Sequence, residues 1–159
     1  MKTLFVLPKM ILLVLLYSNF SAHSQNLNAA TDLTAPFLKE TFENALVTVL
    51  EVKDDYIKTK DVFDFYIDID PAKRFVSFSG NFLLVEGTPL PKILELMNRF
   101  NTEIIMVKSY YNASANSISV YYYFWTEGGF TKQSLLKSYK MMRLAVNLML
   151  EKDTDKIMK

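Results

Sequence analysis

Apolar residues recur at every second position in one segment near the middle of the chain. Between residues 61 and 70, phenylalanine and isoleucine alternate with acids and a tyrosine. A period of two is typical of a strand with one buried side, which here leaves the acids facing solvent. Further segments rich in β-branched and aromatic residues lie at 74–79, 82–85, 102–111 and 117–125. Short turns at 70–73 and 112–116 connect neighbouring segments, so we expect antiparallel pairing.

Three other segments carry apolar residues at helical spacing. Thr34 caps a helix that we expect to end near Val52, a second helix follows Pro89 and ends at Asn101, and Thr131 caps a third. Strands joined by short turns form an antiparallel sheet that the helices can cover. The predicted fold class is therefore α+β, an antiparallel sheet with flanking helices in the order α-β-β-(β)-α-β-β-α.

The first 24 residues have the pattern of a secretory signal. Two lysines precede an unbroken apolar run at 10–17, and small residues stand just before Gln25. The run is shorter than the roughly 20 apolar residues that a membrane-spanning helix needs. We therefore predict a signal peptide at 1–24, a flexible lead at 25–34, a single α+β domain at 35–152 and a polar tail at 153–159. The protein is expected to be exported, periplasmic or extracellular, and soluble.

Composition narrows the chemistry of the expected mature chain. The chain has no cysteine, and its only histidine, His23, falls within the predicted signal. A lipid anchor on cysteine is thereby excluded, and the mature chain lacks histidine and cysteine, the two side chains that do most catalytic and metal chemistry. We predict a non-enzymatic protein with no cofactor and no metal. A carboxylate-dependent hydrolase stays open as a remote alternative, using Glu86 with Glu127 or the strand aspartates.

Charge argues against nucleic acid as a partner. Removal of residues 1–24 takes two lysines and no acid, which leaves 16 basic against 17 acidic residues. Nucleic-acid-binding domains usually carry a basic excess gathered on one face. We expect a protein partner, or a second copy of the chain, rather than DNA or RNA. No stable membrane insertion is expected after signal cleavage.

An aromatic strip is the candidate binding site. Tyr121, Tyr123 and Trp125 alternate along the last long strand, on the side opposite to Val120 and its apolar neighbours. Tyr111 on the preceding strand is expected to extend the strip. Exposed rings of this kind anchor protein partners, because they bury a large area at low entropic cost. The alternative is that a helix or a second subunit covers the strip, which would make it part of a core.

Two short motifs resemble the YbjN family. They are the helix end Leu96-Met97-Asn98-Arg99-Phe100-Asn101 and the loop Glu127-Gly128-Gly129-Phe130-Thr131 before the last helix. The similarity covers roughly residues 45–150. The family is described as containing sensory transduction regulators and resembles type III secretion chaperones in fold. The resemblance implies a YbjN-like fold, a partner-binding role, possible dimers and no catalytic residues, whereas the export signal departs from the family pattern.

These observations lead to one expected function and one main alternative. The expected function is an exported, non-enzymatic protein-binding domain of a chaperone-like or regulatory kind. The alternative is a secreted domain that binds a peptide, glycan or other small ligand on the same aromatic sheet face.

Overall fold

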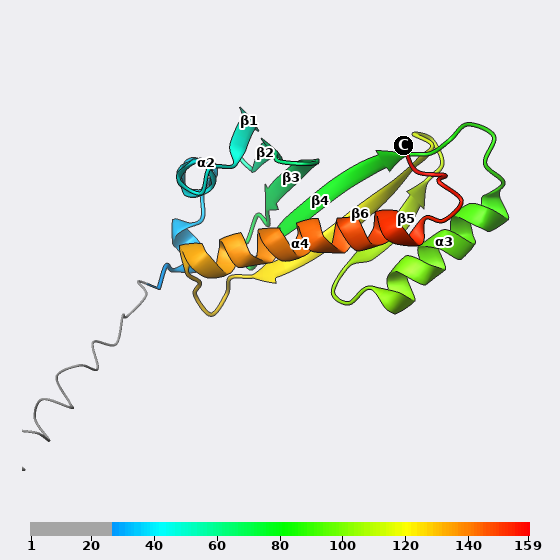
Figure 1. Ribbon diagram of the computed structural model, residues 1–159. Coiled ribbons are helices and arrows are strands. Elements are labelled where there is room, and N and C mark those ends of the chain that lie inside the picture. The colour runs from blue at the N-terminus through cyan, green and yellow to red at the C-terminus, as the bar shows by residue number, and fades with distance from the viewer. Residues whose placement is uncertain (1–26) are drawn as a thin grey trace, which may run out of the picture.

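The computed structural model describes residues 27–159, so the predicted signal peptide lies outside the described residues. The chain forms a six-stranded antiparallel sheet in the order β1-β2-β3-β4-β6-β5 (Figure 1). The strands are β1 Thr48–Val52, β2 Tyr56–Lys60, β3 Asp64–Ile69, β4 Phe75–Leu83, β5 Lys108–Asn112 and β6 Ser117–Trp125. The helices are a short 3-10 turn, η1 Ala30–Asp32, then α2 Ala35–Asn44, α3 Leu90–Glu103 and α4 Lys132–Lys152. The predicted α+β class is confirmed.

The sheet is built around the pairing of β4 with β6. Nine residue pairs run from Phe75 opposite Trp125 to Leu83 opposite Ser117. On one side of this ladder, Val76, Phe78 and Tyr122 are buried beneath the helices, and Phe124, the partner of Val76, is half-buried against the same core. α4 crosses that side along most of the length of the ladder (Figure 1). Because side chains alternate along a strand, the other set of β4 and β6 residues must face away from the helices.

Tyr139 of α4 joins the helices to the sheet. Its ring meets Phe42 of α2 edge-on at 5.0 Å and Phe65 of β3 at 5.7 Å. A third ring, that of Phe78 in β4, lies 6.1 Å away, and the Tyr139 hydroxyl lies 3.4 Å from the Thr59 hydroxyl of β2. The core is therefore one continuous cluster between the sheet and a single layer of helices.

β4 continues through the position where a break was predicted. Gly80 lies inside the strand opposite Val120, rather than in a turn between two strands. A Cβ at Gly80 would lie 3.2 Å from the Phe65 ring, which is tighter than ordinary packing. Glycine suits this position because any side chain here would have to displace the neighbouring ring by a few tenths of an ångström.

The first predicted helix is too long, and two strands were missed. α2 ends at Asn44, and Leu46 with φ of 63° turns the chain into β1. The residues after this turn are rich in β-branched types, which disfavour a helix and suit a strand. β2 then pairs with both β1 and β3. The sheet therefore begins at Thr48 rather than at residue 61.

Both ends of the described chain are packed, which corrects the predicted flexible lead and polar tail. Asn28 exchanges backbone hydrogen bonds of 2.7 and 3.0 Å with Phe130, and Leu33 is fully buried. At the other end, Ile157 and Met158 are buried, and Val85 donates a 2.8 Å backbone hydrogen bond to the Ile157 carbonyl. The packed domain therefore extends beyond 35–152 in both directions. Among the described residues, no helix combines the length and apolarity needed to cross a membrane.

Asn101 protects an edge of the sheet instead of ending a helix. α3 continues past it to Glu103. The Asn101 side-chain amide accepts from the Ser109 N–H at 2.8 Å and donates to the Ser109 carbonyl at 3.1 Å. It thus pairs with the outer edge of β5 much as a neighbouring strand would. Covering an edge in this way limits unwanted strand pairing.

Replacing Asn101 tests this role. We expect Asn101→Ala to lower the free energy of unfolding by about 1–3 kcal/mol, because it leaves the partly buried Ser109 groups without their partner. Chemical denaturation measures the change. Asn98→Ala, an exposed asparagine on the same helix, is the control and should change stability by less than about 0.5 kcal/mol. Equal effects of the two variants would contradict the edge-protection role.

Candidate functional site

The side of the sheet away from the helices, here called the open face, has small polar residues at its centre. Ser77 and Ser79 of β4 and Ser119 of β6 are all buried although none of the described helices lies over them. Ser119 donates to the Asn81 side chain at 2.5 Å, and Ser77 donates to Asp68 of β3 at 3.3 Å. The larger side chains of the neighbouring strands therefore project further from the sheet than these small polar residues.

Five aromatic rings stand along one half of this face and form the aromatic strip: Phe75, Tyr110, Tyr121, Tyr123 and Trp125. Trp125 and Tyr123 each pack against Phe75 with ring centroids 5.4 Å apart. Tyr123 stacks on Tyr121 at 6.4 Å, and Tyr121 stacks on Tyr110 at 5.4 Å with 15° between the ring planes. The Tyr110 and Tyr121 hydroxyls are hydrogen-bonded at 2.9 Å. The rings therefore hold one another in place across three strands.

The strip is exposed in this chain. Trp125 is 63% exposed, Tyr110 47% and Tyr123 43%. No helix within residues 27–159 covers the strip, so the interpretation that one of these helices buries it is excluded. A group of large rings at these exposures is the kind of surface that marks an interaction site.

Tyr111 does not belong to the strip, contrary to the prediction. It pairs with Ile118 and packs against the core on the helix side. The register of the β5–β6 hairpin places Tyr110 opposite Ser119 on the open face instead. Phe75 was missed, although its alternation with Val76 at the start of β4 is the signal that could have found it.

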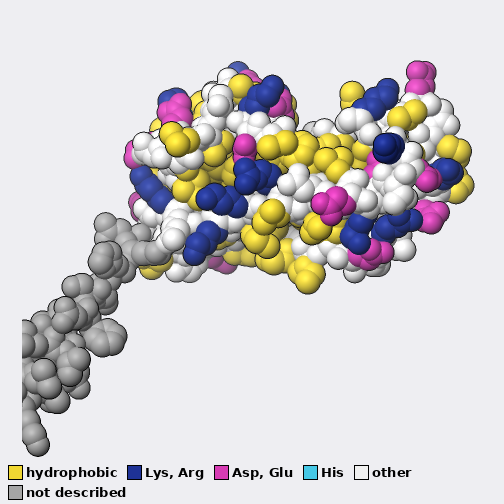
Figure 2. Space-filling model, viewed as in Figure 1, with side chains coloured by type: hydrophobic (Ala, Val, Ile, Leu, Met, Phe, Trp, Pro, Cys, Tyr) yellow, Lys and Arg dark blue, Asp and Glu magenta, His cyan; other side chains and the backbone are white. Residues whose placement is uncertain are grey.

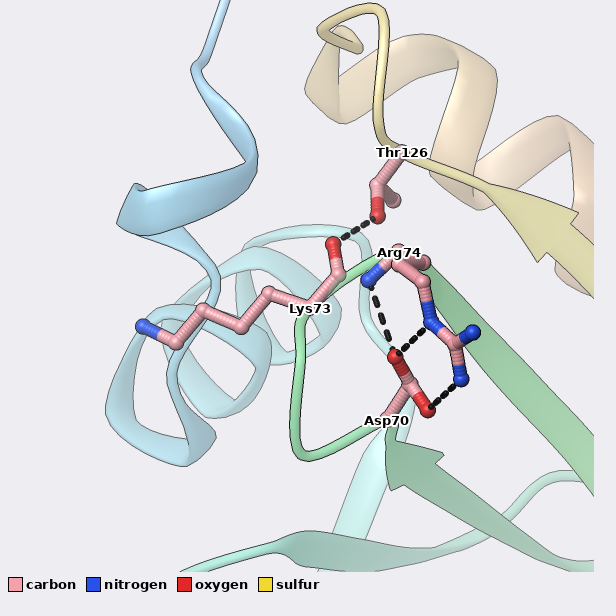
Figure 3. A network of polar contacts seen from close by, with 4 residues as sticks. All are labelled: Asp70, Lys73, Arg74 and Thr126. Carbon is pink, nitrogen blue, oxygen red and sulfur yellow. Dashed lines mark hydrogen bonds and ion pairs between the residues drawn. The ribbon is translucent and has the colours of Figure 1, made fainter.

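A polar network fixes the Trp125 end of the strip (Figure 3). The Arg74 guanidinium donates to both Asp70 carboxylate oxygens, at 2.8 and 3.0 Å, and lies 5.6 Å from the Phe75 ring centre. Beside it, the Thr126 hydroxyl donates to the Lys73 carbonyl at 2.7 Å. These contacts tie the β3–β4 turn to the end of β6. They hold Phe75 and Trp125 at one end of the open face.

The backbone of β6 has an unpaired edge beside the same rings. β5 pairs with β6 only as far as Tyr121. Thr126, just after β6, donates its N–H to the carbonyl of Arg74, just before β4. Backbone groups alternate in direction along a strand, so those of Tyr123 and Trp125 point away from β4, toward the side that β5 leaves open. A groove of about 610 Å³, lined by Met106, Lys108 and these two residues among others, lies at this edge.

Two groups on the open face have raised pKa values. Burial raises the pKa of the Asp68 carboxyl, while the hydrogen bond from Ser77 opposes that shift. Burial, followed by the hydrogen bond with Tyr110, raises the pKa of the Tyr121 hydroxyl. The tyrosine is therefore neutral at ordinary pH. The strip presents uncharged rings with Asp68 beside them.

The structure does not bring the proposed hydrolase acids together. Glu86 follows β4 at its Leu83 end, whereas Glu127 follows β6 at its Trp125 end. The ladder between these ends is roughly 27 Å long, at about 3.4 Å per residue. A glycosidase pair needs carboxyl groups within about 10 Å. Within residues 27–159, no three histidine, cysteine or acidic side chains are grouped to hold a metal ion.

Comparison with known proteins places the fold. No protein-family model matches the sequence, and no characterised protein matches it by sequence. A fold search matches the crystal structure of YbjN from E. coli, which has been put forward as a transcription regulator, with a TM-score of 0.60 and 15% identity over 78% of this chain and 94% of that one. The HopA1–SchA chaperone–effector complex matches with a TM-score of 0.49 and 8% identity, over 70% of this chain and 89% of the matched chain.

The chain is an α+β protein whose antiparallel sheet carries its helices on one side. Within that class its fold is YbjN-like, as the resemblance implied. At this level of identity the match describes the fold alone.

The ion pair at the end of the strip has a measurable pH signature. The Arg74 guanidinium lowers the pKa of Asp70 to about 2 from an unfolded value near 3.8. Because the folded pKa is the lower one, the stabilisation is complete above about pH 4 and is lost as pH falls toward 2. We expect Asp70→Asn to lower the melting temperature at pH 7 and to have a much smaller effect at pH 2.

Thermal unfolding of wild type and variant across this pH range measures the effect. Asp54→Asn, which removes an exposed acid from the β1–β2 turn, is the control. An Asp70→Asn effect of the same size at both pH values would show that the charge of Asp70 contributes nothing.

Proposed function

We propose that the protein is an exported, non-enzymatic module that binds a partner protein through the aromatic strip. The observation that carries the proposal is a set of five mutually packed rings, three of them exposed and two half-buried, on a sheet face that no helix within residues 27–159 covers. Ring contacts and the hydroxyl hydrogen bond hold the side chains in position before binding. Such preorganisation reduces the entropic cost of forming an interface.

The edge of β6 favours an extended partner segment. The backbone groups of Tyr123 and Trp125 can accept a further strand, and the rings beside them can hold its side chains. Lys108 lines the adjacent groove, where its ammonium group can pair with an acidic residue of the segment. The HopA1–SchA complex joins a chaperone to its effector, but its likeness to this chain is too weak to support the proposal.

A glycan is less well suited to this surface. A sugar ring packs on the free face of an aromatic ring, whereas the three tyrosines of the strip stack on one another. Stacking in this way covers ring faces that a sugar would need. A chaperone-like or regulatory partnership in the periplasm or outside the cell accords with the signal-like sequence at 1–24 and the charge balance of the remaining chain.

Trp125 provides a direct test, because it is the only tryptophan of the chain. Its emission reports the environment of the strip and of no other place. Burial by a partner should shift the emission to shorter wavelength and reduce quenching by acrylamide. A protein of residues 25–159 can be titrated with acidic extended peptides and, in parallel, with oligosaccharides. A response to oligosaccharides alone would contradict the proposal and favour the ligand-binding alternative.

Affinity capture from cell extract tests the same surface against the proteins that the cell contains. We expect Tyr123→Ala with Trp125→Ala to reduce capture of a bound protein at least about tenfold, since exposed aromatic anchors dominate such interfaces. Val62→Ala, an equally exposed apolar residue between β2 and β3, is the matched control. Circular dichroism must show both variants folded. Capture that survives the double substitution would place the binding surface elsewhere.

A further inference from the structure

The side of α4 that faces solvent carries a row of exposed residues, with three apolar side chains at its centre and one charged side chain at each end. Its positions are Lys137, Met141, Leu144, Leu148 and Glu151, separated by four, three, four and three residues, and all are exposed. This spacing keeps the five side chains on one face of the helix. Figure 2 shows hydrophobic side chains gathered over the middle of α4. We call these five residues the α4 stripe.

The apolar surface continues from the stripe onto the turn before β5. Ile105 is 85% exposed and Met106 is 62% exposed. A groove of about 220 Å³ between this turn and α4 is lined by Met106, Met141, Leu144 and Leu148 among others. Scattered apolar residues on a surface need no explanation, but a continuous group beside a groove marks an interaction site.

The charges at the two ends of the stripe indicate what covers it. Lys137 stands at one end and Glu151 at the other, and neither forms an ion pair within residues 27–159. Each lies seven residues from Leu144, or about 10 Å along the helix axis. A second α4 laid antiparallel across Leu144 would therefore place each lysine near a glutamate of the other chain. A parallel arrangement would oppose like charges at both ends.

We propose that the α4 stripe is a self-association surface through which two copies of the chain pair with their α4 helices antiparallel. The stripe is self-complementary under a two-fold axis near Leu144, as a closed dimer requires. Met141, Leu144 and Leu148 bury one another at the centre, and the two lysine–glutamate pairs set the direction. This surface lies on the helix side of the sheet, so the proposal does not rest on the function assigned to the aromatic strip.

The test is the mass of the protein in solution. Residues 25–159 contain every described residue and can be examined by light scattering and analytical ultracentrifugation from about 1 µM to about 500 µM. We expect a concentration-dependent dimer, and Leu144→Asp should raise its dissociation constant at least about tenfold. Leu90→Asp is the matched control, because Leu90 at the start of α3 is also half exposed, at 50% against 51% for Leu144. A wild-type protein that stays monomeric overturns the proposal, as does a dimer that Leu144→Asp leaves intact.

Charge reversal tests the antiparallel arrangement without disturbing the apolar centre. Lys137→Glu and Glu151→Lys should each weaken the dimer, because each opposes two like charges across the interface. The double variant should restore the dissociation constant toward the wild-type value. Added salt should reduce the difference in dissociation constant between each single variant and the wild type. Single reversals that have no effect, or a double variant as weak as the single ones, overturn the antiparallel pairing.

Discussion

The nine-pair ladder between β4 and β6 is the constraint on which the rest of the structure depends. Once Phe75 is opposite Trp125, every side chain of both strands is assigned to one side of the sheet. One set faces Tyr139 and the helices and becomes the core. The other set includes the serines and the rings of the strip, which none of the described helices covers. A slip of β6 by one residue against β4 would exchange the two sides of β6 and bring Tyr123 under α4 in place of Tyr122, so burial of the core fixes the composition of the open face as well.

The ladder also explains why large rings stay ordered on an uncovered face. An exposed tyrosine or tryptophan keeps its rotamer freedom unless contacts with other groups hold it in one position. Here each ring of the strip packs against at least one other, and Arg74, held by Asp70, closes the end beside Phe75. The serines between β3 and β6 leave room for these rings to stand upright. Order on this face thus comes from the side chains themselves rather than from burial under a helix.

The sequence predicts the elements whose pattern is set by a single buried side. The strands β3 and β6, with their alternating side chains, are of this kind, and so is the set of apolar α4 residues that face the core. For each, the sequence predicted the type of element and its approximate position. β1 was predicted as helix because Ala45 and Val49 continue the spacing of Leu38 and Phe42, and only the left-handed turn at Leu46 ends it. Tyr110 and Tyr111 differ by one position, so their sides depend on the hairpin register, which a five-residue polar link does not specify. Gly80 resembles a strand break until the Phe65 ring beside it is known.

The two candidate surfaces lie on opposite sides of the sheet, and this separation has a functional consequence. The aromatic strip faces away from the helices, whereas the α4 stripe is on the outer side of the helix layer. Two chains paired through α4 would therefore turn their strips outward, in opposite directions. Pairing through α4 would leave the rings of both strips uncovered, and the two grooves share only Met106, Val107 and Tyr122, so one dimer could hold two partner segments at once. Linking two binding sites in this way raises the avidity for a partner with repeated segments without any new contact at either strip.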